Sequence, residues 1–224
     1  MIEVRDVSHA YGEREVLRSV GVTLAEDRIG LIGANGSGKS TFARLLNGLV
    51  LPSRGEVLVH GVSTRTDAAA VRRMVGFVFT DPDAQIVMPT VAEDVAFGLR
   101  RHRHGRDKTD RIVAEALAAV GLTGHAEHPA HLLSGGQKQL LALTSVLVTE
   151  PRIVVCDEPT TLLDLANTRR VLEILRGLPQ QLVMVTHDLD SVRDFDRVLV
   201  FDNGRIVADD APAAAVAHYR ALVG

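Results

Sequence analysis

The sequence predicts an α/β fold in which a mostly parallel sheet is covered by helices on both faces. Near-continuous apolar segments of strand length alternate with helical segments, as is typical of strands buried on both faces. The first part of the chain, residues 1–65, contains short strands joined by turns, and residues 90–150 change to helical spacing. We therefore expect an α/β core with an antiparallel β part near the N-terminus and a helical insertion.

Each element follows from its residues in chain order. Strands are expected where β-branched and aliphatic residues gather between turn residues, at 2–7, 16–24, 29–32, 56–59 and 75–79. A helix is expected from Lys39 to about Asn47, and apolar residues at helical spacing predict further helices between 90 and 150. Strands return at 153–156, 182–186 and 198–201, the last followed by an Asn-Gly hairpin signal, and the alanine-rich stretch 211–217 predicts a terminal helix.

Composition excludes several classes of protein. The 224 residues are 46% hydrophobic and 24% charged, which excludes intrinsic disorder and suffices for a core without disulfides. The net charge of −3 lacks the basic footprint of a nucleic-acid-binding protein. No apolar run approaches the roughly 20 residues that cross a bilayer, and a single cysteine, Cys156, excludes a disulfide within the chain. We expect a reducing compartment, the cytoplasm, and no nucleic-acid partner.

A glycine-rich segment lies between the expected strand 29–32 and the helix that follows it. Residues 33–40 read Gly-Ala-Asn-Gly-Ser-Gly-Lys-Ser, which satisfies the phosphate-loop pattern in its proper context. Glycines let backbone N–H groups curl around phosphate oxygens, and the helix N-terminus adds further donors. Lys39 is expected to reach the β- and γ-phosphates, and Ser40 to ligate Mg²⁺. The plain alternative is an ordinary strand-to-helix turn.

An acidic pair ends another apolar strand. Residues 153–158 read Ile-Val-Val-Cys-Asp-Glu, and packing explains this pair poorly because burying unpaired carboxylates is costly. Asp157 is the expected metal-side carboxylate, which holds Mg²⁺ through its water shell. Glu158 is the candidate base that polarises water toward the γ-phosphate. For Cys156 we expect a small core residue rather than a redox role.

The residues at the start of a second predicted helix indicate a protein family. Residues 133–139 read Leu-Ser-Gly-Gly-Gln-Lys-Gln, a serine cap followed by two glycines, which predicts a second cradle for anions. Taken alone, such a helix start is often only a cap. About 20 residues before Asp157, the segment resembles the signature of the ATP-binding cassette (ABC) family. The resemblance covers essentially the whole chain.

The resemblance implies roles for further residues. Tyr11 resembles the aromatic residue that stacks on adenine, and His187 the histidine that contacts the γ-phosphate, although an ordinary turn aromatic and a polar strand cap remain alternatives. The phosphate loop that binds ATP would comprise Gly33, Ala34, Asn35, Gly36, Ser37, Gly38, Lys39, Ser40 and Thr41. Residues 161–164 resemble the loop that crosses a dimer interface. In the family, two cassettes pack head to tail, so these signature-side residues would act on the partner's nucleotide: Ser134, Gly135, Gly136, Gln137 and Asp164.

The sequence departs from the family pattern after the strand 75–79. Family members usually carry a glutamine there, which ligates Mg²⁺ and senses the transporter, whereas this chain has Thr80, whose hydroxyl can still touch a metal-bound water. Gln85 could take over the glutamine's role at the nucleotide or contact a membrane subunit instead. The stretch 81–85 resembles the energy-coupling-factor branch, which imports vitamins and cobalt or nickel ions. Within that branch, Thr80 and the Ile-Val-Met-Pro-Thr segment at 86–90 look most like the ATPase of biotin importers.

Taken together, the resemblance implies a P-loop NTPase (RecA-like) core with an N-terminal antiparallel β subdomain and an inserted α-helical subdomain. Within one cassette domain, 1–224, residues 1–81 and 151–224 would form the catalytic core and 82–150 the signature subdomain. The expected function is ATP hydrolysis with Mg²⁺ in an importer, with a second ATPase subunit (homodimer or heterodimer) and separate transmembrane and substrate-binding subunits, at the cytoplasmic face of the membrane. The alternatives are a soluble cassette ATPase of translation or DNA repair and an exporter cassette.

Two further features of the sequence are expected to have little functional importance. A basic run at 100–108 is expected to be a solvated linker, with contact to anionic lipid or a membrane subunit as the alternative. His125, His128 and His131 recur every three residues, but Gly124 and Pro129 break the helix that would align them as metal ligands.

Overall fold

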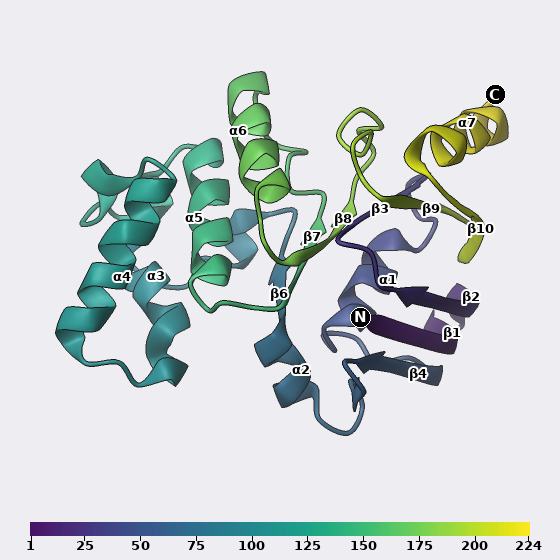
Figure 1. Ribbon diagram of the computed structural model, residues 1–224, viewed down its shortest axis with the longest axis horizontal. Helices are drawn as coiled ribbons and strands as arrows, with labels where there is room; N and C mark the ends of the chain where they lie inside the picture. The colour runs from purple at the N-terminus through teal and green to yellow at the C-terminus, as the bar shows by residue number, and fades with distance from the viewer. The chain divides into compact units, whose positions relative to one another are not determined.

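The structure is a computed structural model that describes all residues, 1–224 (Figure 1). The chain forms two compact units. The first, which we call the α/β unit, comprises Met1–Phe77, Arg152–Glu158 and Leu178–Gly224. The second, which we call the helical unit, comprises Val78–Pro151 and Pro159–Gly177.

A six-stranded sheet organises the α/β unit, with strand order β10-β9-β3-β8-β7-β6. Its central strands run parallel: β3 pairs with both β8 and β9, and β7 pairs with β8. β10 is antiparallel to β9, as the hairpin signal after residue 201 predicts. The strand bounds are β3 (Arg28–Gly33), β6 (Val75–Val78), β7 (Ile153–Asp157), β8 (Gln181–Val185), β9 (Arg197–Asp202) and β10 (Arg205–Asp210). The parallel strands are almost wholly buried, which explains their continuous apolar sequences.

The second sheet is antiparallel and has the order β2-β1-β4-β5. Its strands are β1 (Ile2–Tyr11), β2 (Arg14–Leu24), β4 (Arg54–Val59) and β5 (Val62–Ser63). β1 largely alternates buried with less buried residues, and it forms with β2 a hairpin whose last pair is Tyr11 with Arg14. The predicted antiparallel β part near the N-terminus is thus confirmed.

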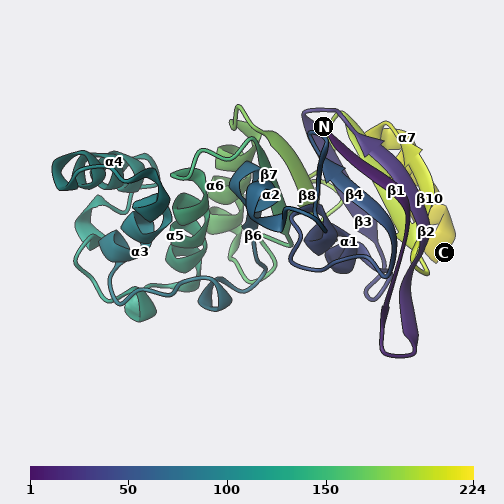
Figure 2. The same ribbon diagram turned by 90° about the horizontal axis from the view of Figure 1, so that it is seen from below.

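Helix α1 (Lys39–Leu46) lies between the two sheets and contacts strands of both (Figure 2). Its Phe42 ring lies 5.0 Å from the ring of Phe201 on β9, and both side chains are fully buried. The unit also contains α2 (Ala68–Met74) and α7 (Pro212–Val223). The sequence analysis missed α2, although Asp67 caps it by accepting a 2.8 Å hydrogen bond from the Ala70 N–H. Because α1 starts directly after the phosphate loop, the core fixes that loop in place.

The helical unit consists of α3 (Val91–Leu99), α4 (Arg106–Ala119), α5 (Gly135–Leu147) and α6 (Leu165–Arg176), with short 3₁₀ turns between them. α5 contacts α3, α4 and α6. Capping boxes begin α3 at Thr90 and α5 at Ser134. α6 groups with this unit because it packs against α5, whereas the sequence analysis counted its residues with the core. Which part of the chain performs catalysis and which carries the signature stays a prediction.

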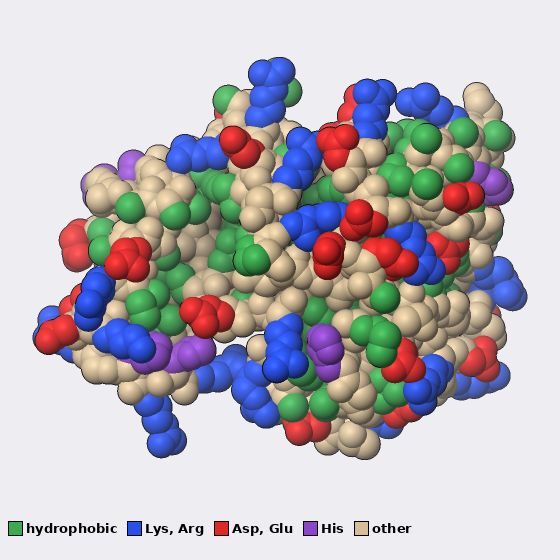
Figure 3. All heavy atoms as spheres, in the orientation of Figure 1, with side chains coloured by type: hydrophobic (Ala, Val, Ile, Leu, Met, Phe, Trp, Pro, Cys, Tyr) green, Lys and Arg blue, Asp and Glu red, His purple; other side chains and the backbone are tan.

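None of the helices has the length and apolar composition that a bilayer crossing needs. On the face drawn in Figure 3, basic and acidic side chains are interspersed, in keeping with the small net charge of −3.

Candidate functional site

The phosphate-loop residues connect the end of β3 to the start of α1. Gly33, Gly36 and Gly38 have φ values of 144°, 78° and 106°, a region that favours glycine. A Cβ on Gly38 would lie 2.9 Å from both Leu17 Cδ2 and the Val16 carbonyl oxygen, so no larger residue fits there. The glycines therefore permit the loop's conformation and also leave its backbone uncovered by side chains.

Lys39, the first residue of α1, turns back into this loop. Its Nζ donates hydrogen bonds of 2.7 Å to the Gly33 carbonyl and 2.9 Å to the Ala34 carbonyl. Burial lowers the pKa of the ammonium, and the negative charges of Glu158 and Asp157 partly restore it. A cation held this way beside the glycine-rich loop is suited to a phosphate, which can replace the two carbonyls as its partner.

Ser40 and Asp157 meet although they are 117 residues apart. The Ser40 hydroxyl donates a 2.7 Å hydrogen bond to Oδ1 of Asp157, and Arg44 lies 3.5 Å from Oδ2. Burial raises the pKa of Asp157, an effect that the Ser40 hydrogen bond and the Arg44 charge partly offset. Hydroxyl and carboxylate oxygens are the ligands that Mg²⁺ prefers, so this pair fits a magnesium ion. Cys156 is fully buried beside them and burial raises the pKa of its thiol, so it is a core residue.

Glu158 and His187 follow β7 and β8, two parallel neighbours whose carboxyl ends meet at the same sheet edge. Nδ1 of His187 lies 2.7 Å from Oε2 of Glu158. Glu158 has φ of 53°, a left-handed conformation that an ordinary residue holds at an energetic cost. Such strain is typical of residues that a functional site positions.

A cavity of about 380 Å³ joins several of these residues. Tyr11, the loop residues 35–41 and Glu158 all line it. Arg14 and Val16 of β2 also line it, and sequence reasoning missed both, although Arg14 lies three residues after the recognised Tyr11. An aromatic residue, the glycine-rich loop, a cation and a carboxylate thus share one cavity.

The signature residues lie at the start of α5 in the helical unit. Ser134 Oγ accepts from the Gln137 N–H at 3.3 Å, and Gln137 Oε1 accepts from the Ser134 N–H at 2.9 Å. Nε2 of Gln137 lies 3.0 Å from Nε2 of His125, so one of the three histidines considered as metal ligands instead contacts the signature. The structure contains no cluster of three or more His, Cys, Asp or Glu residues that could hold a metal ion.

Asp164 caps α6 and is connected to the signature through a residue that the sequence analysis missed. Its Oδ1 accepts a 2.8 Å hydrogen bond from the Asn167 N–H, and its Oδ2 a 3.0 Å bond from Asn167 Nδ2. The Asn167 side chain fills the space that a Cβ on Gly136 would occupy. Gly136 is therefore required by close packing as well as by its place in the motif.

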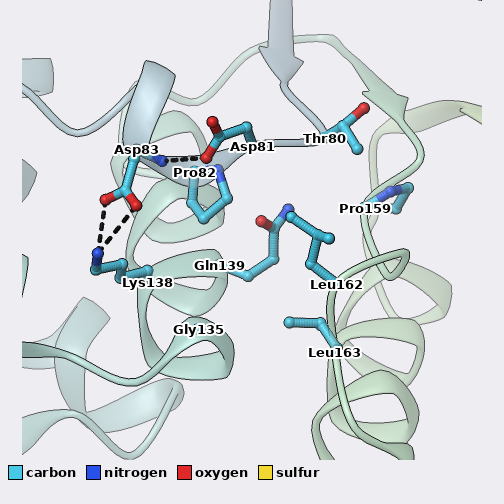
Figure 4. A pocket seen from close by; sticks show the side chains of 10 residues that line it. All are labelled: Thr80, Asp81, Pro82, Asp83, Gly135, Lys138, Gln139, Pro159, Leu162 and Leu163. Atoms are coloured by element: carbon cyan, nitrogen blue, oxygen red, sulfur yellow. Dashed lines mark hydrogen bonds and ion pairs between the residues drawn. The ribbon is translucent and has the colours of Figure 1, made fainter.

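Thr80 lines a second, smaller cavity of about 130 Å³ within the helical unit (Figure 4). Figure 4 shows Asp83 and Lys138 facing each other there, with Lys138 Nζ 2.7 Å and 3.0 Å from the two carboxylate oxygens. Gln85 accepts from the Phe79 N–H at 3.1 Å and donates to the Ala142 carbonyl at 3.2 Å. Its amide thus joins the 79–85 segment to α5, and a role for Gln85 at ATP would require it to give up both bonds.

Comparison with known proteins agrees with this geometry. The family model described as "ABC transporter" matches residues 17–161. The chain is 57% identical over 220 residues to a Deinococcus radiodurans protein that carries the provisional name ABC transporter ATP-binding protein, covering 98% of this chain and 97% of that one. It is 44% identical over 221 residues to the biotin transport ATP-binding protein BioM of Rhizobium etli, covering 99% and 98%. The solved structure of cbiO1 from Clostridium perfringens, described as part of the ABC transporter complex cbiONQ, is similar with a TM-score of 0.85 at 29% identity, covering 99% of this chain and 92% of that one.

Proposed function

Because this chain belongs to the ABC transporter family, as an ATP-binding and ATP-hydrolysing subunit, we propose that it drives an importer of the energy-coupling-factor type. The transported substrate would be a vitamin, with biotin the first candidate, or a metal ion. Similarity to BioM and to cbiO1 supports this proposal, as does the resemblance of residues 81–85 to that branch.

The cavity shared by Tyr11, the phosphate loop and Glu158 is the observation that carries the catalytic part of the proposal. Tyr11, a residue that is 49% exposed, offers its ring as a stacking surface for adenine. The loop N–H groups and Lys39 bind the phosphate chain, because Lys39 exchanges two carbonyl partners for phosphate oxygens. The nucleotide is thus held at both ends.

Ser40 and Asp157 are the residues that would hold Mg²⁺, and their hydroxyl and carboxylate oxygens fit it. When bound, the ion neutralises negative charge on the phosphates. Thr80 is the third residue that we propose for the metal site, where its hydroxyl would touch a metal-bound water.

Hydrolysis requires a water molecule aligned with the γ-phosphorus. Glu158 would accept the proton of this water as its oxygen bonds to the γ-phosphorus, while the bond from that phosphorus to the oxygen bridging the β- and γ-phosphates breaks. His187 holds the Glu158 carboxylate at 2.7 Å, which orients it for this task. The side chain of His187 is 61% exposed, so it can also meet a γ-phosphate.

A second ATPase subunit would complete each site. We propose a head-to-tail dimer, of two identical chains or two related ones, in which Ser134, Gly135, Gly136, Gln137 and Asp164 act on the partner's nucleotide. Leu162 and Leu165, two apolar residues that are each 67% exposed, flank Asp164 and support an interface there. The dimer would bind transmembrane and substrate-binding subunits at the cytoplasmic face of the cell membrane.

Affinity purification from the native host tests this assignment. The tagged chain, extracted from membranes in mild detergent, should bring down integral membrane subunits, and mass spectrometry identifies them. Cells carrying Glu158→Gln should lose uptake of one labelled substrate among biotin, cobalt and nickel. Asp190→Asn, the same acid-to-amide change at an exposed residue paired with Arg193, is the matched control and should retain uptake.

Other outcomes would contradict the proposal. Co-purification with ribosomes or DNA-repair proteins, and none with membrane subunits, would favour a soluble cassette ATPase. Normal uptake of all three substrates together with accumulation of a compound that wild-type cells expel would favour an exporter.

A further inference from the structure

Arg14 lies at the mouth of the nucleotide cavity, opposite Tyr11. The two residues form the last cross-strand pair of the β1–β2 hairpin, and both line the cavity. Nη2 of Arg14 lies 3.9 Å from the place that a Cβ on Gly36 would occupy, in the middle of the phosphate loop. The hairpin end therefore presents an aromatic ring and a guanidinium toward the same space.

The guanidinium of Arg14 has no partner within the chain. Glu13 and Glu15 flank it in sequence and share with it a neighbouring cavity of about 410 Å³, yet neither forms an ion pair with it. Arg18, on the same strand, pairs with Glu15 at 3.6 Å. A cation that faces a phosphate site without a carboxylate partner is free to bind an anion.

We propose that Arg14 is a nucleotide-binding residue whose guanidinium contacts the phosphate chain of the bound nucleotide. Its planar fork of donors matches phosphate oxygens, and its approach to Gly36 directs it to the phosphates rather than to the base, which Tyr11 serves. The inference rests on the proposed nucleotide cavity. It adds a second cation, on the hairpin side, to Lys39 on the loop side.

Substitution of Arg14 separates binding from folding. Because Arg14 has no partner in the fold, Arg14→Gln should leave the free energy of unfolding of the nucleotide-free chain unchanged. The dissociation constant for ATP, measured by calorimetry on the full chain, should rise roughly tenfold, the range of a solvent-exposed charge-assisted hydrogen bond. Arg14→Lys keeps the charge and loses the planar fork of donors, so its dissociation constant for ATP should lie between those of the wild type and Arg14→Gln.

Arg18→Gln is the matched control, since it removes the same charge from the same strand outside the nucleotide cavity. It should leave ATP affinity within about twofold of wild type. An equal loss in both variants would mean that only the general positive field matters, and would overturn a specific contact by Arg14.

Inorganic tripolyphosphate, used as a competitor of ATP, shows which part of the nucleotide Arg14 contacts. Arg14→Gln should weaken tripolyphosphate binding by the same factor as ATP binding. Weakened ATP binding with unchanged tripolyphosphate binding would place Arg14 at the base or ribose and overturn the proposal, and unchanged ATP binding would also overturn it. Lys39→Ala distinguishes failure of the proposed cavity from failure of the Arg14 proposal. If Lys39→Ala binds ATP normally, the cavity itself is misassigned. If Lys39→Ala loses ATP binding and Arg14→Gln does not, only the Arg14 proposal is rejected.

Discussion

Nδ1 of His187 and Oε2 of Glu158 lie 2.7 Å apart, across the carboxyl ends of two adjacent parallel strands. In the register of β7 with β8, Asp157 pairs with Val185. Glu158 is the residue after Asp157 and His187 is the second residue after Val185, so this pairing brings the two close together. The sheet itself, rather than a long loop, sets the distance between the proposed base and its partner. This makes the pair a feature that substitution can test.

Glu158→Gln should abolish hydrolysis while preserving nucleotide binding. The amide cannot accept the water's proton, and loss of a general base typically lowers turnover by about 10²- to 10⁴-fold. Its volume is unchanged, so the dissociation constant for ATP should stay within about twofold. Phosphate-release assays and calorimetry measure the two quantities. Turnover above a tenth of the wild-type rate would exclude Glu158 as the base.

Lys39→Ala should abolish ATP binding and leave the chain folded. The variant loses the cation proposed to meet the β- and γ-phosphates, whereas α1 keeps its apolar contacts through Phe42, Leu45 and Leu46. Calorimetry should detect no binding at ATP concentrations that saturate the wild type. The far-ultraviolet circular dichroism spectrum should match that of the wild type. Wild-type affinity in this variant would contradict the phosphate site.

ATP with Mg²⁺ should convert the Glu158→Gln chain from monomer to symmetric dimer. Nucleotides trapped in a shared interface stabilise the dimer, since they contact both subunits there and only one subunit in the monomer. Light scattering should report a doubling of mass with ATP and a monomer with ADP as the control. A monomer under both conditions would count against a homodimer, and mixing with a second cassette from the same host would then test for a heterodimer.

Gln85→Ala should weaken the helical unit more than it impairs catalysis. The variant loses the bonds to the Phe79 N–H and the Ala142 carbonyl, each worth about 1 kcal/mol, so the free energy of unfolding should fall by roughly 1–2 kcal/mol. Urea titration measures this loss. A large loss of hydrolysis in isolated Gln85→Ala with unchanged stability would instead place Gln85 at the nucleotide.

Thr80→Gln should leave hydrolysis intact or raise it, because the longer amide restores the residue that the family usually carries.

Local sequence predicted the phosphate loop because its function depends on consecutive residues. Strand, glycines, lysine and helix follow one another, so residues 33–41 could be assigned without knowing the fold. Asp157 was predictable for a similar reason, as a carboxylate that ends a buried strand. The burial of that strand and the Ser40 contact agree with this reasoning.

Arg14 and Asn167 could not be found in this way, because their positions depend on register and packing. The β1–β2 ladder contains three register shifts before it ends on the Tyr11 and Arg14 pair, and no sequence pattern specifies them. Asn167 matters because α6 packs on α5, a contact between helices that are separated by a strand in the sequence. Such relationships appear only when the chain is folded.

The close packing of Asn167 against Gly136 also has a genetic consequence. The same amide holds Asp164, so a methyl group added at position 136 would push on the cap of α6 as well as on the signature helix. A strain carrying Gly136→Ala should therefore be rescued by second-site suppressors that shorten residue 167, such as Asn167→Ser, and not by changes elsewhere on α6. The start of α5 and the cap of α6 would then be coupled genetically, because a defect in either is compensated by a change at Asn167, which contacts both.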